Sequence, residues 1–223
     1  MDTILYITFG FLDVIAILAL IFKLFRFPFW DYFKEFSIIG ICLTFISYLL
    51  RVQFNIPEID MVVQFVIFVL FFRYWIKIRL FYSIFLSTLG GISLIVIQLA
   101  MISVLLSVNM ISIDDTQAID KIGTYLIQMF SQITSFSISL VLYRFNLGFS
   151  FIMSPPHDVD RNVSLQQVNT YLVYSVSIGV IVLAISLYFL LHYLSLLAVV
   201  GVVIVLAALL LFYLSHKKDY SRL

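Results

Sequence analysis

The chain has 223 residues, of which 63% are hydrophobic and only 11% are charged, and its formal net charge is +1. Soluble domains carry about 45–50% apolar and about 25% charged residues, so a water-soluble fold of this composition would expose large apolar patches. The composition, with a mean hydropathy of +1.14, excludes an ordinary soluble protein and predicts an all-α, polytopic membrane protein.

Apolar stretches that are long enough to cross a bilayer recur along the chain. A helix needs roughly 20 apolar residues to cross a hydrocarbon core of about 30 Å. In chain order, the predicted spans are residues 4–22, 36–50, 61–76, 81–108, 125–143, 168–191 and 194–214. The last two spans share one apolar block, which we divide at a turn near residues 192–195, and a short tail follows at 215–223. The sequence predicts a single transmembrane domain of seven helices over residues 1–223.

Basic residues are distributed unequally between the predicted connections. Eleven of the 13 Lys and Arg residues lie in alternate connections and in the tail, and only Arg51 and Lys121 lie on the other side. Because cytoplasmic loops are enriched in Lys and Arg, this pattern predicts an amino terminus outside and a carboxyl terminus in the cytoplasm. Arg51, at the end of the second span, is expected to extend outward to the membrane surface. Asp60 is expected on the same outer side.

The residues that usually carry catalysis or metal binding are scarce. Cys42 is the single cysteine, and the three histidines, His157, His192 and His216, fall in three different connections. No glycine-rich phosphate loop and no hydrolase or metalloprotease motif is present. No basic cluster of the size that binds nucleic acid occurs either. We therefore expect a protein that is not an enzyme, with no cofactor, no metal site and no nucleic-acid partner.

Asp13 stands out because it is a carboxyl group at the centre of the first span. Placing it there costs about 2.5–3.5 kcal/mol on insertion scales, so such a residue usually faces the interior of the bundle or a wet cavity. Two interpretations remain open at this point: a ligand contact or switch element, and a hydrogen-bonded tie between helices.

A polar stripe marks the fifth span. Its members stand at offsets of 0, 4, 7, 8, 11 and 15, so they lie on one helical face: Thr124, Gln128, Ser131, Gln132, Ser135 and Ser139. Gln64 in the third span and Gln98 in the fourth add two amides. The candidate ligand-binding residues are therefore Asp13, Gln64, Gln98, Gln128 and Gln132, which would suit an extracellular ligand with amide groups, such as a small peptide. The alternative is that these residues only join helices, at about 0.6 kcal/mol each.

Two other classes of membrane protein remain as alternatives. One is a small-solute transport subunit, although all four prolines lie in loops and no pair of interrupted helices of the kind found in carriers occurs. The other is an accessory or structural membrane protein without a ligand.

Local sequence also carries a resemblance. The segments LFRFPFWDYF at 24–33 and ISYLLR at 46–51, with a last span that leads into HKK, resemble the sensor half of accessory-gene-regulator-type peptide-pheromone receptor histidine kinases of Gram-positive bacteria. The resemblance covers about residues 1–214. It implies seven helices, an outer site for a small peptide, a location in the bacterial cytoplasmic membrane and signalling through a cytoplasmic kinase or membrane partner.

The chain departs from that family after the last span. Only SHKKDYSRL follows Leu214, whereas a phosphoacceptor helix and an ATP-binding domain would need on the order of 200 residues. Two expectations remain open: a stand-alone receptor-like protein that is embedded in lipid and acts through a partner, and the membrane half of a longer sensor.

Overall fold

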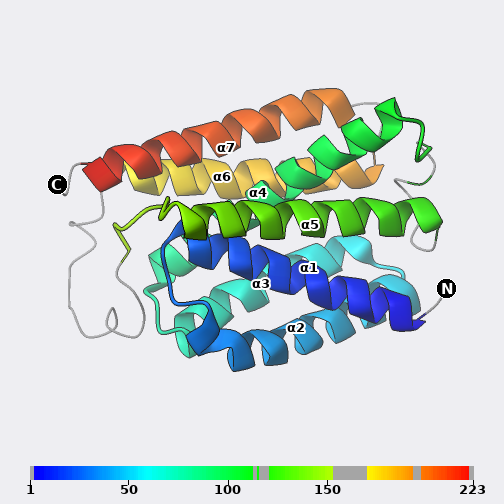
Figure 1. Ribbon diagram of the computed structural model, residues 1–223, viewed down its shortest axis with the longest axis horizontal. Coiled ribbons are helices and arrows are strands. Elements are labelled where there is room, and N and C mark those ends of the chain that lie inside the picture. The colour runs from blue at the N-terminus through cyan, green and yellow to red at the C-terminus, as the bar shows by residue number, and fades with distance from the viewer. Residues whose placement is uncertain (1–2, 113–114, 116–120, 153–169, 193–196, 221–223) are drawn as a thin grey trace.

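The computed structural model describes residues 3–112, 115, 121–152, 170–192 and 197–220, which fold as a bundle of helices (Figure 1). The helices are α1 (Thr3–Leu24), α2 (Phe33–Tyr48), α3 (Pro57–Leu70), α4 (Leu80–Ser107), α5 (Ile122–Arg144), α6 (Thr170–His192) and α7 (Leu197–Tyr220). No strand occurs among the described residues. The predicted fold class, an all-α bundle of seven helices, is confirmed.

The second and third helices are longer than the sequence pattern predicted. A 3-10 turn, η1 (Trp30–Tyr32), precedes α2, and a π-helical turn, η2 (Leu49–Gln53), continues it, which gives a helical run of 24 residues. Helix α3 begins at Pro57, ahead of the predicted start, and ends in a second π-helical turn, η3 (Phe71–Trp75). Proline suits the first turn of a helix because its missing N–H would have no partner there. The predicted turn near 192–195 lies mostly outside the described residues, as does most of the predicted connection between α5 and α6.

Within the described residues, five helical runs are long and apolar enough to cross a membrane: Thr3–Leu24, Trp30–Gln53, Leu80–Ser107, Ile122–Arg144 and Val199–Lys217. The outer faces of the helices carry large apolar side chains, among them Ile41, Phe45, Val62 and Leu140, all more than half exposed. Exposure of such a surface to water is unfavourable, whereas contact with lipid chains is not. The chain is a multi-pass helical membrane protein. The chain ends lie at opposite ends of the bundle (Figure 1), and which end faces outward remains a prediction.

Helix α1 lies between α2 and α5 and also contacts α4. From Val14 to Phe22 every side chain is buried, as expected for a helix that is apolar all round. Asp13 stands where α1 changes from half-exposed to fully buried. The contact with α4 is close, because a Cβ added at Gly90 would lie 2.3 Å from Cδ1 of Ile21.

Five helices end in the same way, with one residue in the left-handed conformation. These residues are Arg26, Asn55, Lys77, Asn109 and Asn146, with φ between 51° and 61°. After α1, for example, the N–H of Phe27 donates to the carbonyl of Phe22 and the N–H of Arg26 to that of Lys23, which is a Schellman motif. Asparagine tolerates this conformation better than most residues. These caps satisfy carbonyl groups that the ends of the helices would otherwise leave without partners.

The end of the bundle where α1 finishes is packed with phenylalanine rings. Phe22 contacts Phe36 with ring centroids 4.6 Å apart, and Phe25 contacts Phe149 and Phe151 at 5.7 and 5.6 Å. The segment after α5 is fixed to α1 by the N–H of Phe149, which donates to the carbonyl of Leu24 at 2.7 Å. The polar side chains that bear on function lie towards the other end.

Candidate functional site

The structure joins two of the candidate ligand-binding residues, Asp13 on α1 and Gln132 on α5. Nε2 of Gln132 donates to Oδ1 of Asp13 at 2.9 Å and to the carbonyl oxygen of Phe9 at 2.9 Å. Gln132 is 4% exposed, and Asp13 is half-buried. Among the described residues, Oδ2 of Asp13 receives no hydrogen bond. The pair therefore ties α1 to α5 and leaves one acceptor unused.

The polar stripe of α5 faces the bundle, as its period predicted. Ser131, Gln132, Ser135 and Ser139 are buried, and Thr124 and Gln128 are half-buried. Ser135 and Ser139 donate to backbone carbonyls one turn earlier, at 2.8 and 2.7 Å, so they need no other helix. The Ser131 hydroxyl is buried without a hydrogen-bond partner in the described part of the chain. The hydroxyl group that precedes Gln132 in the sequence is therefore not satisfied by the described part of the chain.

Gln98 and Gln128 are half-buried, and within the described ranges neither side chain has a hydrogen bond. They do not meet. The hydroxyl of Thr134 on α5 donates to the sulfur of Met101 on α4 at 3.5 Å, which sets the register of this antiparallel pair. In that register Gln98 lies level with residue 137, roughly 14 Å along the axis from Gln128. Gln128 lies one turn before Gln132 on the same face of α5, and within the described residues no hydrogen bond joins Gln98 or Gln128 to Asp13.

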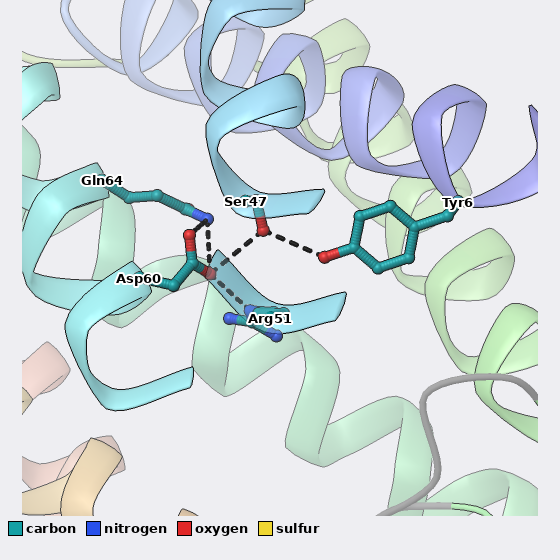
Figure 2. Close-up of polar contacts among 5 residues, drawn as sticks. All are labelled: Tyr6, Ser47, Arg51, Asp60 and Gln64. Atoms are coloured by element: carbon teal, nitrogen blue, oxygen red, sulfur yellow. Dashed lines mark hydrogen bonds and ion pairs between the residues drawn. The ribbon is translucent and has the colours of Figure 1, made fainter. Parts of the chain in front are cut away.

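Gln64, the remaining candidate, belongs to a different cluster around Asp60, which Figure 2 shows. Nε2 of Gln64 lies 3.1 and 3.0 Å from the two carboxylate oxygens of Asp60. The hydroxyl of Ser47 donates to Oδ2 of Asp60 at 3.0 Å, and the hydroxyl of Tyr6 lies 3.0 Å from that of Ser47. Nε of Arg51 also donates to Oδ2 of Asp60. The cluster joins α1, the α2–η2 run and α3.

One expectation is corrected at this cluster. Arg51 does not extend freely to the membrane surface, because its side chain is 33% exposed and paired with Asp60. Asp60, which is expected on the outer side of the membrane, is fully buried in the first turn of α3, and its side of the membrane stays a prediction. The physical reason is the short connection 54–56, which folds the end of η2 against the start of α3. The i, i+4 spacings Ser47–Arg51 and Asp60–Gln64 on the two sides of that connection were the signal in the sequence.

The two carboxyl groups differ in how fully they are satisfied. Asp60 accepts hydrogen bonds from Ser47, Arg51 and Gln64, and the guanidinium neutralises its charge. Asp13 has one donor among the described residues. Tyr6 and Asp13 are seven residues apart on α1, about 10 Å along the axis and on nearly the same face. The Asp60 carboxylate is thus fully satisfied, whereas the Asp13 carboxyl group retains capacity to accept from a further donor.

In the described part of the chain, no group of three or more His, Cys, Asp or Glu side chains is arranged to hold a metal ion. Comparison of the chain with protein-family models, with curated proteins and with solved structures finds no match.

Proposed function

We propose that this protein is a receptor of the bacterial cytoplasmic membrane that binds a small extracellular peptide and signals through a partner, without enzymatic activity. The partner would be a cytoplasmic kinase or another membrane protein, as the resemblance to peptide-pheromone receptors implies. The ligand would lie between α1 and α5, on the side towards the start of both helices.

The observation that supports this proposal is the contact between Asp13 and Gln132. Oδ2 of Asp13, the buried hydroxyl of Ser131 and the side chain of Gln128 offer hydrogen-bonding capacity that the described protein does not use. Lipid cannot supply hydrogen bonds, so such groups persist in a span where water or a ligand reaches them. A peptide brings N–H donors for the carboxyl group and both donors and acceptors for the amide and the hydroxyl.

Binding of a ligand at this position would displace α1 relative to α5. Asp13 precedes the fully buried part of α1, which contacts α2, α4 and α5. At the far end the ammonium of Lys23 lies 4.3 Å from the ring centroid of Tyr143. A small displacement of α1 against α5 would therefore reach the aromatic end of the bundle, near the end of α7.

The proposal is tested by pulsed electron paramagnetic resonance, which measures the distance between two spin labels. The labels are placed through Leu147→Cys and Tyr213→Cys in a Cys42→Ser background, since both side chains are exposed, at 51% and 64%. The protein is reconstituted in lipid nanodiscs. The probe is the small-peptide fraction of the growth medium from a culture of the bacterium that makes this protein. We expect the distance distribution to change with the probe and not to change in the Gln128→Leu variant.

Gln128 is the informative position because its side chain has no hydrogen bond in the described part of the chain, so its loss leaves the fold intact. No change in the parent protein would contradict the receptor proposal. Uptake of labelled peptide into proteoliposomes would instead favour the transport alternative.

A further inference from the structure

Arg51 presents one edge of its guanidinium that the described protein leaves unused. The group carries five N–H donors, and Nε–H is directed to Asp60. Among the described residues, the two terminal nitrogens donate to no acceptor. The Arg51 side chain is 33% exposed while the Asp60 side chain that its Nε faces is 0% exposed, so the exposed part of Arg51 lies away from Asp60.

The position of Arg51 is fixed from behind by a side chain that cannot move away. Asp60 is 0% exposed and is itself held by Ser47 and Gln64 (Figure 2). A guanidinium held by its Nε loses little further freedom when its terminal nitrogens bind a second group. A group on the far edge lies nearer to the guanidinium than to the Asp60 carboxylate, so attraction to the cation exceeds repulsion from the anion.

We propose that the terminal nitrogens of Arg51 bind an oxyanion, a carboxylate or a phosphate group. The planar fork of arginine matches both groups in a two-pronged geometry. The surroundings suit a ligand at a membrane interface: Tyr48 lies one turn before Arg51, and its ring packs 5.8 Å from that of Tyr6. The oxyanion comes either from a lipid headgroup or from a dissolved anion. This site does not depend on the receptor proposal, which concerns Asp13 and Gln132.

Arg73 provides a matched control within the same molecule. It also lies in a π-helical turn that ends a helix, and it is also half-buried. Its terminal nitrogen Nη1, however, lies 3.4 Å from the carbonyl oxygen of Ile78, so the protein already uses the edge that is unused in Arg51. Arg73→Gln removes the same charge without touching the proposed site.

The test is the thermal unfolding midpoint of the purified protein in neutral detergent, followed by circular dichroism, with two probes. One is phosphatidylglycerol compared with phosphatidylcholine of the same chains, and the other is inorganic phosphate compared with chloride at equal ionic strength. A ligand present at about ten times its dissociation constant should raise the midpoint by about 3–5 °C for a chain of this length. Because Arg51→Gln alone strands the buried Asp60, the variant used is Arg51→Gln with Asp60→Asn, which removes both charges together.

We expect at least one probe to raise the midpoint of the parent protein and of Arg73→Gln, and the rise to vanish in the double variant. A rise with phosphatidylglycerol alone identifies the lipid headgroup as the source, whereas a rise with inorganic phosphate identifies a dissolved oxyanion. No rise in the parent protein with either probe overturns the proposal. An undiminished rise in the double variant overturns it as well, because the anion then binds elsewhere.

Discussion

Single residues decide how much each polar cluster contributes to stability. The two clusters differ in how deeply their carboxyl groups are buried and in how many donors those groups have. The Asp60 carboxylate is fully buried and paired, so its contribution to stability depends on whether Arg51 is present. Replacement of one member of a buried ion pair leaves an uncompensated charge, whereas replacement of both is often close to neutral. Asp13, by contrast, is half-buried and has one described donor.

The Asp60 pair is tested by a double-mutant cycle. Arg51→Met should lower the free energy of unfolding by about 3–5 kcal/mol, because the fully buried Asp60 carboxylate is then left unpaired. Adding Asp60→Leu should recover most of that loss. Equilibrium unfolding in mixed micelles gives the four values, and two independent, additive losses would show that the ion pair is not the element that matters.

The α5 amides give a second prediction at this scale. Gln132→Leu removes two hydrogen bonds to α1 and should cost about 0.5–1.5 kcal/mol for each. Gln128→Leu removes none among the described residues and should leave stability within about 0.5 kcal/mol of the parent. Equal losses in the two variants would mean that the Gln128 amide is also a tie between helices and not a ligand contact.

Between whole elements, close approach and capping set the geometry. Helix α1 approaches α4 so closely at Gly90 that a methyl group there must displace Ile21. At Gly201 on α7 an added Cβ would lie 3.7 Å from Leu99, which is ordinary van der Waals contact. The same substitution therefore has different consequences on two helices.

Gly90→Ala should destabilise the bundle by about 1–3 kcal/mol, the usual cost of overpacking a core. Gly201→Ala should be neutral or slightly stabilising, because alanine is the better helix former. Combining Gly90→Ala with Ile21→Val, which shortens the side chain in the way, should restore part of the loss. Thermal unfolding compares the variants, and equal effects at the two glycines would contradict the close packing of α1 on α4.

The segment before α5 carries a pH-dependent contact outside the spans. The N–H of Ser112 and then its hydroxyl donate to Asp115, and this holds the pKa of the Asp115 carboxyl below its usual range. A carboxyl whose pKa is lower in the folded state contributes stability that is present above the unfolded value of about 4 and is lost as pH falls through the folded value. The difference in thermal unfolding midpoint between the parent protein and Asp115→Asn should therefore be present at neutral pH and vanish in acid. A difference that grows in acid would contradict a stabilising contact between Ser112 and the Asp115 carboxylate.

For the molecule as a whole, the arrangement in helices can be predicted from the sequence more completely than the contacts within the candidate site. Apolar length and composition predict seven helices because lipid demands both, and the seven helices are present. The stripe on α5 was readable because helical period places its members on one face. Which residues meet across helices was not readable, since that depends on register: Gln132 joins Asp13 and Ser47 joins Asp60, whereas Gln98 has no hydrogen bond in the described part of the chain.

Labelling of intact cells with a membrane-impermeant maleimide tests the account most directly, in a Cys42→Ser background with one added cysteine at a time. The account predicts labelling of Lys121→Cys at the start of α5 and of Gln128→Cys in the site. It predicts no labelling of Arg144→Cys at the other end of α5, nor of Ile133→Cys, whose side chain is 53% exposed on the outer face of the helix. Labelling of both Lys121→Cys and Arg144→Cys from outside would contradict the membrane topology. Labelling of Lys121→Cys without Gln128→Cys would contradict a site between α1 and α5 that opens outward.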